Sequence, residues 1–173
     1  MKRFLFFTFL LFFTSISFGQ NLTLSQVLSI RKLNIGNAEE YLTQRKWKFF
    51  GAKEPKDGYL GYLDFAYNVS TFDDKAESFL TLYYSNYSSS DNRILIQVVK
   101  EAKYNEYVNQ IKAWGGKIIK SYVEDDRLYK IYQGSTMTYI VRTFTQDESI
   151  YSKKTVYDFL IMTNEDYAIF SLL

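Results

Sequence analysis

The sequence predicts an α+β protein: two tandem helix–four-strand units that form one mostly antiparallel sheet of about eight strands with helices on one face. Two observations lead to this prediction. Segments with helical spacing of apolar residues precede runs rich in β-branched and aromatic residues, and this order occurs twice. No helical segment separates successive strands within a unit, so we expect them to pair antiparallel. We place the units at 20–100 and 101–173, within one domain.

The first unit begins with two short helices. Thr23-Leu24-Ser25-Gln26 has the capping-box pattern and predicts a helix that ends near Leu33. Asn37-Ala38-Glu39-Glu40 predicts the start of a second helix, which ends near Lys46, with Asn34-Ile35-Gly36 as the turn between them. Four strands follow, which we place at 47–53, 59–69, 78–86 and 93–100.

The second unit begins with the clearest amphipathic helix of the chain. Its apolar stripe consists of Tyr104, Tyr107, Val108, Ile111 and Trp114, and Gly115-Gly116 ends it. Four further strands are expected at 117–124, 127–133, 136–145 and 155–163, with a polar loop at 146–154 between the last two. The tail, 164–173, is expected to pack onto the fold.

A short internal match supports duplication. Residues 40–47 read EYLTQRKW, and in 106–114, EYVNQIKAW, the residues Glu, Tyr, Gln, Lys and Trp recur in the same order.

The element order resembles the tandem architecture of the β-lactamase inhibitory protein family across the whole mature chain. This chain departs from the family because it lacks the cysteines that brace the repeats and has a single helix in the second unit. The resemblance implies a concave sheet that grips another protein, and it transfers no contact residue. Four phrases are also similar to those of small uncharacterised exported bacterial proteins, a likeness that implies no activity: Glu40-Tyr41-Leu42, Tyr83-Tyr84-Ser85, Tyr132-Gln133-Gly134 and Ile161-Met162-Thr163.

Residues 1–19 have the pattern of a secretory signal peptide. A basic start, Met1-Lys2-Arg3, precedes an apolar run, and Ser17-Phe18-Gly19 gives a small-x-small cleavage signal before Gln20. The alternative, an uncleaved anchor, needs about 20 apolar residues, and this run has about ten. We therefore expect an exported protein, periplasmic or extracellular, with no stable membrane insertion after cleavage.

Composition excludes several classes of chemistry. The chain has no Cys and no His, which excludes disulfides, thiolate zinc sites, imidazole metal ligands and Ser-His-Asp triads. We expect no catalytic residue, no metal site and no cofactor. Loss of Lys2 and Arg3 with the signal leaves 19 basic and 19 acidic residues, so the mature chain is neutral. We therefore expect no nucleic-acid partner, since binding to nucleic acid favours a basic surface.

Tyrosine is the most informative residue type, with 16 copies. Several lie on the strand parity opposite to the apolar residues, and we expect them to point to solvent from the face that the helices leave uncovered. Tyr and Arg are suited to partner recognition because both give large contact areas with polar tips. The predicted partner-binding residues are Tyr62, Asp64, Thr81, Tyr83, Gln97, Lys130, Tyr132, Arg142 and Asp158.

The sequence thus predicts a non-enzymatic binding protein that grips a protein or peptide partner on this face. Two alternatives stay open. A carbohydrate-binding or glycan-processing envelope protein would use Asp64 and Asp158 as its carboxylates, which requires a separation of about 5–5.5 Å or roughly 6.5–9.5 Å. A structural envelope component would show dispersed tyrosines and no pocket. The sequence leaves the oligomeric state open.

Overall fold

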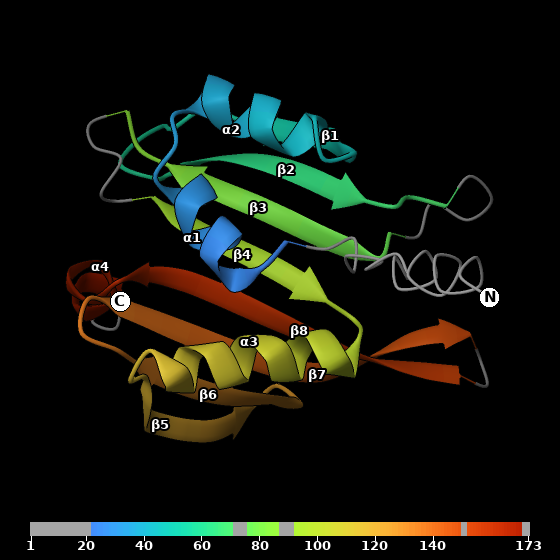
Figure 1. Cartoon of the computed structure of the whole chain (residues 1–173), viewed down its shortest axis with the longest axis vertical. Coiled ribbons are helices and arrows are strands. Elements are labelled where there is room, and N and C mark those ends of the chain that lie inside the picture. The colour runs from blue at the N-terminus through green and yellow to red at the C-terminus, as the bar shows by residue number, and fades with distance from the viewer. Residues whose placement is uncertain (1–21, 71–75, 87–91, 150–151, 171–173) are drawn as a thin grey trace, which may run out of the picture.

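The computed structural model describes residues 22–70, 76–86, 92–149 and 152–170, so the predicted signal peptide, 1–19, lies outside the described residues. This part of the chain contains four helices and one antiparallel sheet of eight strands (Figure 1). The elements are α1 Leu24–Arg31, α2 Ile35–Thr43, β1 Trp47–Lys53, β2 Gly61–Tyr67, β3 Ser78–Tyr84, β4 Arg93–Val98, α3 Glu101–Ala113, β5 Lys117–Glu124, β6 Arg127–Gln133, β7 Met137–Ser149, β8 Ser152–Thr163 and α4 Asn164–Phe170.

The sheet consists of two four-stranded meanders joined side by side. The strand order is β1-β2-β3-β4-β8-β7-β6-β5, and every neighbouring pair is antiparallel. The junction pairs the last strand of each meander, with Gln97 opposite Asp158. The predicted antiparallel α+β sheet is therefore confirmed.

The helix ends follow local side-chain chemistry. Thr23 accepts a hydrogen bond from the Gln26 amide while the Gln26 side chain accepts one from the Thr23 amide, so the predicted capping box is present. The predicted start of α2 is wrong: Asn34 is the cap, and its side chain accepts from the Asn37 amide at 2.9 Å. Either Asn suits a cap by residue type, and only the backbone conformation decides between them.

The predicted turn between β5 and β6 is present, whereas the predicted loop between β7 and β8 is not. Asp125 and Asp126 both have left-handed φ angles, 47° and 59°, as a two-residue type I′ turn requires. The predicted loop at 146–154 is wrong, because β7 and β8 continue past the sheet as a two-stranded arm (Figure 1). Asp147 lies opposite Lys153 in this arm, and opposite charges on facing strands stabilise such pairs.

Three helices, α1, α2 and α3, lie against one face of the sheet, which we call the covered face (Figure 1). Its core contains large side chains from both meanders, all essentially inaccessible to solvent: Trp47, Phe65, Leu80, Leu82, Ile94, Ile96 and Phe159. The α3 residue Tyr107 packs edge-on against Phe159 and donates its hydroxyl to the Leu22 carbonyl at 2.5 Å. This contact ties the start of the described chain to the second meander.

The fourth helix contradicts the expectation that all helices share one face. Tyr167 of α4 packs against a cluster on the opposite side of the sheet, formed by Ile131, Ile140 and Met162. Asp166 holds α4 there through two hydrogen bonds with Arg93, at 2.7 and 2.8 Å. Short-range periodicity did not reveal α4, because the pairing that anchors it joins residues 73 positions apart.

Candidate recognition face of the sheet

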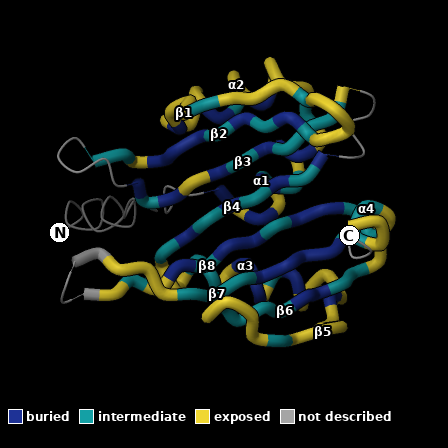
Figure 2. The backbone as a smooth tube through the Cα atoms, turned by 180° about the vertical axis from the view of Figure 1, so that it is seen from behind, coloured by how far each residue is buried: buried dark blue, intermediate teal, exposed yellow. Residues whose placement is uncertain are grey.

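The face of the sheet opposite α1–α3, which we call the open face, is seen in Figure 2. Cross-strand pairing places Tyr62 opposite Tyr83 and Asp64 opposite Thr81. Asp158 has Gln97 on one side and Arg142 on the other. The structure thus brings seven of the nine predicted residues onto one face: Tyr62, Asp64, Thr81, Tyr83, Gln97, Arg142 and Asp158.

The other two predicted residues lie on the covered face, so their predicted placement is wrong. Tyr132 is 2% exposed and belongs to the main core. Lys130 lies opposite Val141, another core residue. In β6 the residues that face the open side include Tyr129 and Ile131. Polarity gave the wrong face because the apolar Ile131 is sheltered by α4.

An ion pair between the buried Asp158 and the partly exposed Arg142 lies at the centre of the open face. Arg142 Nη2 lies 2.8 Å from Asp158 Oδ2, and Gln97 Nε2 donates to Asp158 Oδ1 at 3.0 Å. Asp158 is only 4% exposed. Burial raises the pKa of Asp158, an effect that outweighs the opposing influence of Arg142 and Gln97. Both carboxylate oxygens are engaged, so this group organises the face and is not available as a free ligand.

The predicted residues on β2 and β3 are partly exposed, unlike the buried Asp158. Thr81 donates its hydroxyl to Asp64 Oδ1 at 2.6 Å, which fixes that carboxylate. Burial raises the pKa of Tyr83, and the negative charge of Asp64 adds to the effect. Tyr83 therefore keeps its proton at neutral pH and presents a phenol able both to donate and to accept a hydrogen bond.

Asp64 and Asp158 are too far apart to form the carboxylate pair of a glycosidase. They lie on β2 and β8, which are separated by β3 and β4. Three inter-strand steps amount to roughly 14 Å along the sheet, whereas a glycosidase pair needs about 5–9.5 Å. Each carboxylate is also held by its own neighbours, Thr81 for Asp64 and Arg142 for Asp158. This geometry removes the hydrolytic role for these two residues.

Two phenylalanines at the β1 side of the open face were missed from the sequence. Phe50 is 65% exposed and Phe79 is 37% exposed, and their rings meet edge to face with centroids 6.3 Å apart. Phe79 shares parity with Thr81 and Tyr83, so alternation was a signal that could have found it. Phe50 could not be found this way, because a β-bulge between Phe49 and Gly51 breaks the alternation of β1.

The open face is bounded at one end by α4. The Arg93 guanidinium is paired with Asp166 and lies 5.1 Å from the Phe170 ring centroid. The exposed Phe50–Phe79 pair lies in the same cross-strand row as the ion pair, because Phe79 is opposite Gln97 and Gln97 is opposite Asp158. The β1–β4 part of the face lies beside α4, whose contacts include Arg93, Ile131, Ile140 and Met162.

Within the ranges that the structure describes, no cluster of three or more Asp or Glu side chains is arranged to hold a metal ion. In the same ranges, no helix combines the length and apolarity that crossing a membrane requires. Comparison of the chain with protein-family models, with curated proteins and with solved structures gave no match.

Proposed function

We propose that this chain is an exported, non-enzymatic binding protein that holds a protein partner on the β1–β4 part of its open face. The single observation that supports this most is the gathering of Tyr62, Tyr83 and Asp64 on one face beside the exposed Phe50–Phe79 pair. Exposed aromatic anchors beside fixed polar groups are the composition of protein-recognition surfaces.

The partner that fits is a protein surface with apolar side chains for Phe50 and Phe79 and hydrogen-bonding groups for the Tyr62–Tyr83 pair. Phe50 presents most of its ring to solvent, so contact with an apolar group would remove that surface from water. The phenols bring polar tips and lose little side-chain entropy on binding. The Asp158–Arg142 pair would stay in place and keep the strands in register beside the contact.

The two-unit organisation is part of the same proposal. Each meander, β1–β4 and β5–β8, follows a helix directly, and the two join through equivalent strands, β4 and β8. A duplicated unit that pairs by its last strand would generate this order. The proposed contact then lies on the first unit alone, since α4 occupies the corresponding side of the second.

A capture experiment with a matched control tests the proposal. Tagged wild-type protein is cross-linked in its native envelope, and the captured partner is then purified and titrated against variants. The double variant Tyr62→Ala/Tyr83→Ala should weaken binding of that partner at least about tenfold, or 1.4 kcal/mol. Tyr59→Ala removes a tyrosine that is 80% exposed but lies in the turn before β2, and it should bind as wild type does.

Stability measurements separate recognition from folding. Both variants should unfold at urea concentrations close to that of wild type, because none of the three tyrosines is fully buried. Equal partner binding by the two variants would contradict the proposed contact surface. Binding that is lost only in parallel with unfolding would contradict it as well.

A further inference from the structure

A second candidate site lies on the other side of the sheet, away from the open face. It is a cavity of about 690 Å³ between the start of α1, the end of α2 and the start of α3. Cavities that bind small molecules measure about 300–1,000 Å³ and combine apolar walls with a few polar groups. This cavity has both features, and its lining shares no residue with the proposed protein contact.

The apolar wall contains an unsatisfied donor. Leu22, Trp47, Tyr67 and Val98 line the cavity, and the Trp47 and Tyr67 ring centroids lie 5.3 Å apart. Trp47 is 2% exposed, yet its indole Nε1 makes no hydrogen bond to any described residue. A buried indole N–H normally has an acceptor, because an unpaired buried donor is unfavourable. An oxygen of a bound molecule would supply that acceptor.

The rim of the cavity carries excess positive charge. Lys100 is paired with Glu77, and Lys103 with Glu106 at 2.9 Å. Arg45 and Lys46 also line the cavity, and neither forms an ion pair with another residue of the described ranges. The Arg45 guanidinium donates to the Tyr41 carbonyl at 3.0 Å and lies 3.6 Å from the Tyr41 ring centroid, contacts that leave its charge without a carboxylate partner.

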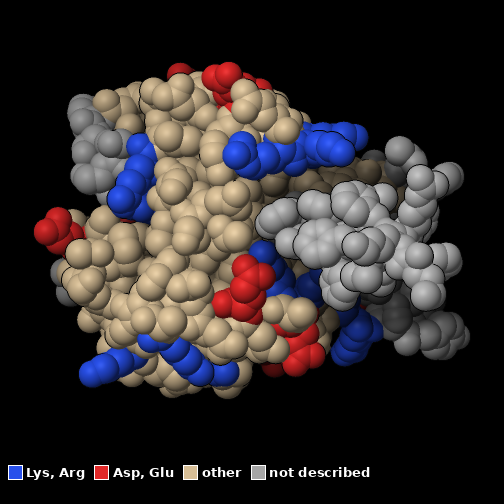
Figure 3. Space-filling view, in the orientation of Figure 1, with Lys and Arg blue, Asp and Glu red and all other residues tan. Residues whose placement is uncertain are grey.

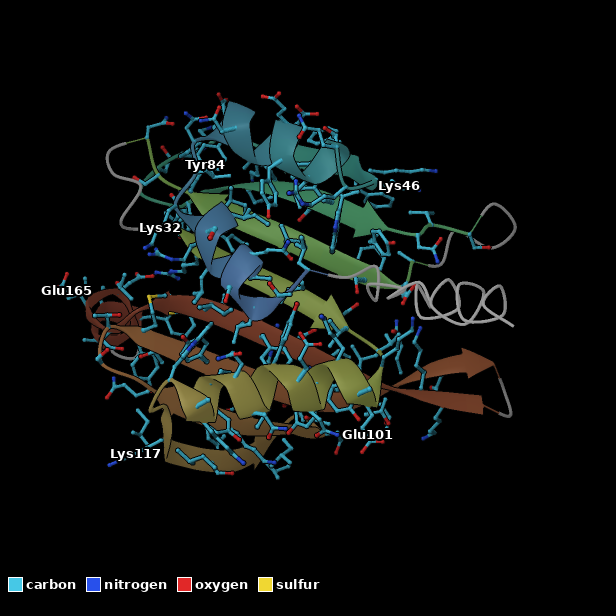
Figure 4. The ribbon with its side chains drawn as sticks, in the orientation of Figure 1. Lys32, Lys46, Tyr84, Glu101, Lys117 and Glu165 are labelled. Carbon is cyan, nitrogen blue, oxygen red and sulfur yellow. The ribbon has the colours of Figure 1, made fainter. Side chains whose placement is uncertain are left out.

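The location of the rim can be followed in two figures. Figure 4 shows Lys46 at the end of α2 and Glu101 at the start of α3, at the same end of the molecule. Figure 3 shows a basic patch at the upper right of the same view, with further basic side chains at the left and lower edges.

We propose that this cavity binds a small amphipathic carboxylate, an apolar body with a single carboxylate group. The apolar body would contact Trp47, Tyr67 and Val98, an oxygen would accept from Trp47 Nε1, and the negative charge would face Arg45 and Lys46. A neutral ligand would leave the excess charge of the rim uncompensated, and a cation would be repelled by it.

Trp47 itself provides the readout. The chain contains two tryptophans, and Trp114 is 41% exposed and outside this cavity. In a Trp114→Phe background, fluorescence therefore reports Trp47 alone. Dodecanoate, added below its micelle concentration, should change the emission saturably with one molecule bound. Dodecyltrimethylammonium, which has the same chain and the opposite charge, should cause no saturable change.

Three variants test the site in that background. Arg45→Gln/Lys46→Asn removes the unpaired charges and should weaken dodecanoate binding about tenfold. Asn is chosen at Lys46 because this residue has a left-handed φ of 66°, which Asn tolerates. Lys32→Gln/Lys117→Gln removes two charges outside the cavity and should leave binding unchanged. Ala102→Trp adds bulk at an exposed position that lines the cavity and should block binding.

The titrations are done on the full chain and on the form that begins at Gln20. Saturable binding by the Gln20 form, weakened by the two cavity variants alone, supports the proposal. Absence of binding in both forms overturns it, and so does equal binding of the cationic probe. If removing residues 1–19 changes the emission and dodecanoate has no effect, the cavity is a binding site for the chain's own N-terminal residues. That result would overturn the proposal as well.

Discussion

The two faces of one sheet serve different purposes in this molecule, although they are built from alternate residues of the same strands. On the covered face, Phe65, Leu80 and Ile96 are completely buried beneath the helices. On the open face, their sequence neighbours Asp64, Thr81 and Gln97 are only partly buried and form polar contacts. Moving one residue along a strand therefore changes the environment from apolar core to hydrogen-bonded surface.

Side chains of this sheet become buried in two ways. The covered face is sealed by separate elements, so its stability depends on apolar packing. The open face shelters Asp158 by the side chains around it, since Gln97 and Arg142 engage both of its oxygens. Polar groups buried in this way need every partner in place.

A pair of phenylalanine truncations should give the largest contrast. Phe159→Ala on the covered face removes a fully buried ring that contacts Tyr104 and Tyr107, and should lower the free energy of unfolding by about 3–5 kcal/mol. Phe79→Ala on the open face should lower it by less than about 1 kcal/mol, because its ring is 37% exposed. Urea denaturation measures both values. Similar losses for the two variants would show that the open face is also a packed core.

The central ion pair should give an intermediate effect. Arg142→Met leaves the Asp158 carboxylate buried without its cation, and we expect a loss of about 2–3 kcal/mol, reduced from the usual range because Arg142 is partly exposed. Arg142→Met/Asp158→Leu removes both charges and should be more stable than the single variant. Urea denaturation of the two variants decides this. A double variant less stable than Arg142→Met would mean that the pair stabilises the sheet outright.

The smallest effect should be a difference in pH dependence between two carboxylates. The folded chain raises the pKa of Asp158 above its ordinary value of 3.8, chiefly by burial, so it binds that proton more tightly than the unfolded chain does. This contribution to stability is complete below 3.8 and is lost as the pH rises through the folded pKa. Burial also acts to raise the pKa of Glu77, but the hydrogen bonds from Lys100 and Asn68 and the positive charges of Lys100 and Lys154 together outweigh it and lower the pKa below 4.5. Its contribution is complete above 4.5 and is lost as the pH falls through the folded pKa.

Urea denaturation between about pH 3 and pH 7 measures both effects. Acidification should make wild type more stable relative to Asp158→Asn and less stable relative to Glu77→Gln. The same sign of change for both variants would contradict the assigned environments.

Much of the architecture was available from the sequence because the signals are local. The capping box at Thr23, the apolar stripe through Tyr107 and Ile111, and the strands 47–53, 117–124 and 127–133 all appear where they were expected. Alternation within β2, β3, β4 and β8 also placed six of the candidate residues on the correct face. The prediction for Arg142 of β7 was correct as well.

Tertiary structure decided what depends on partners distant in the chain. Tyr132 was assigned to the wrong face because the shelter that α4 gives to Ile131 reversed the usual relation between polarity and exposure. Phe50 became an exposed neighbour of Phe79 through a bulge that alternation does not predict.

The sequence by itself determined that this chain forms helices followed by antiparallel strands, and that it lacks the thiol and imidazole groups of many enzymes. Only the tertiary structure decided which meander edges join, which face α4 covers, and where Arg45 and Lys46 meet the walls of a cavity. The physical reason is range. Side-chain periodicity and capping act over a few residues, whereas faces, ion pairs and cavities are set by contacts between segments that the chain brings together only on folding.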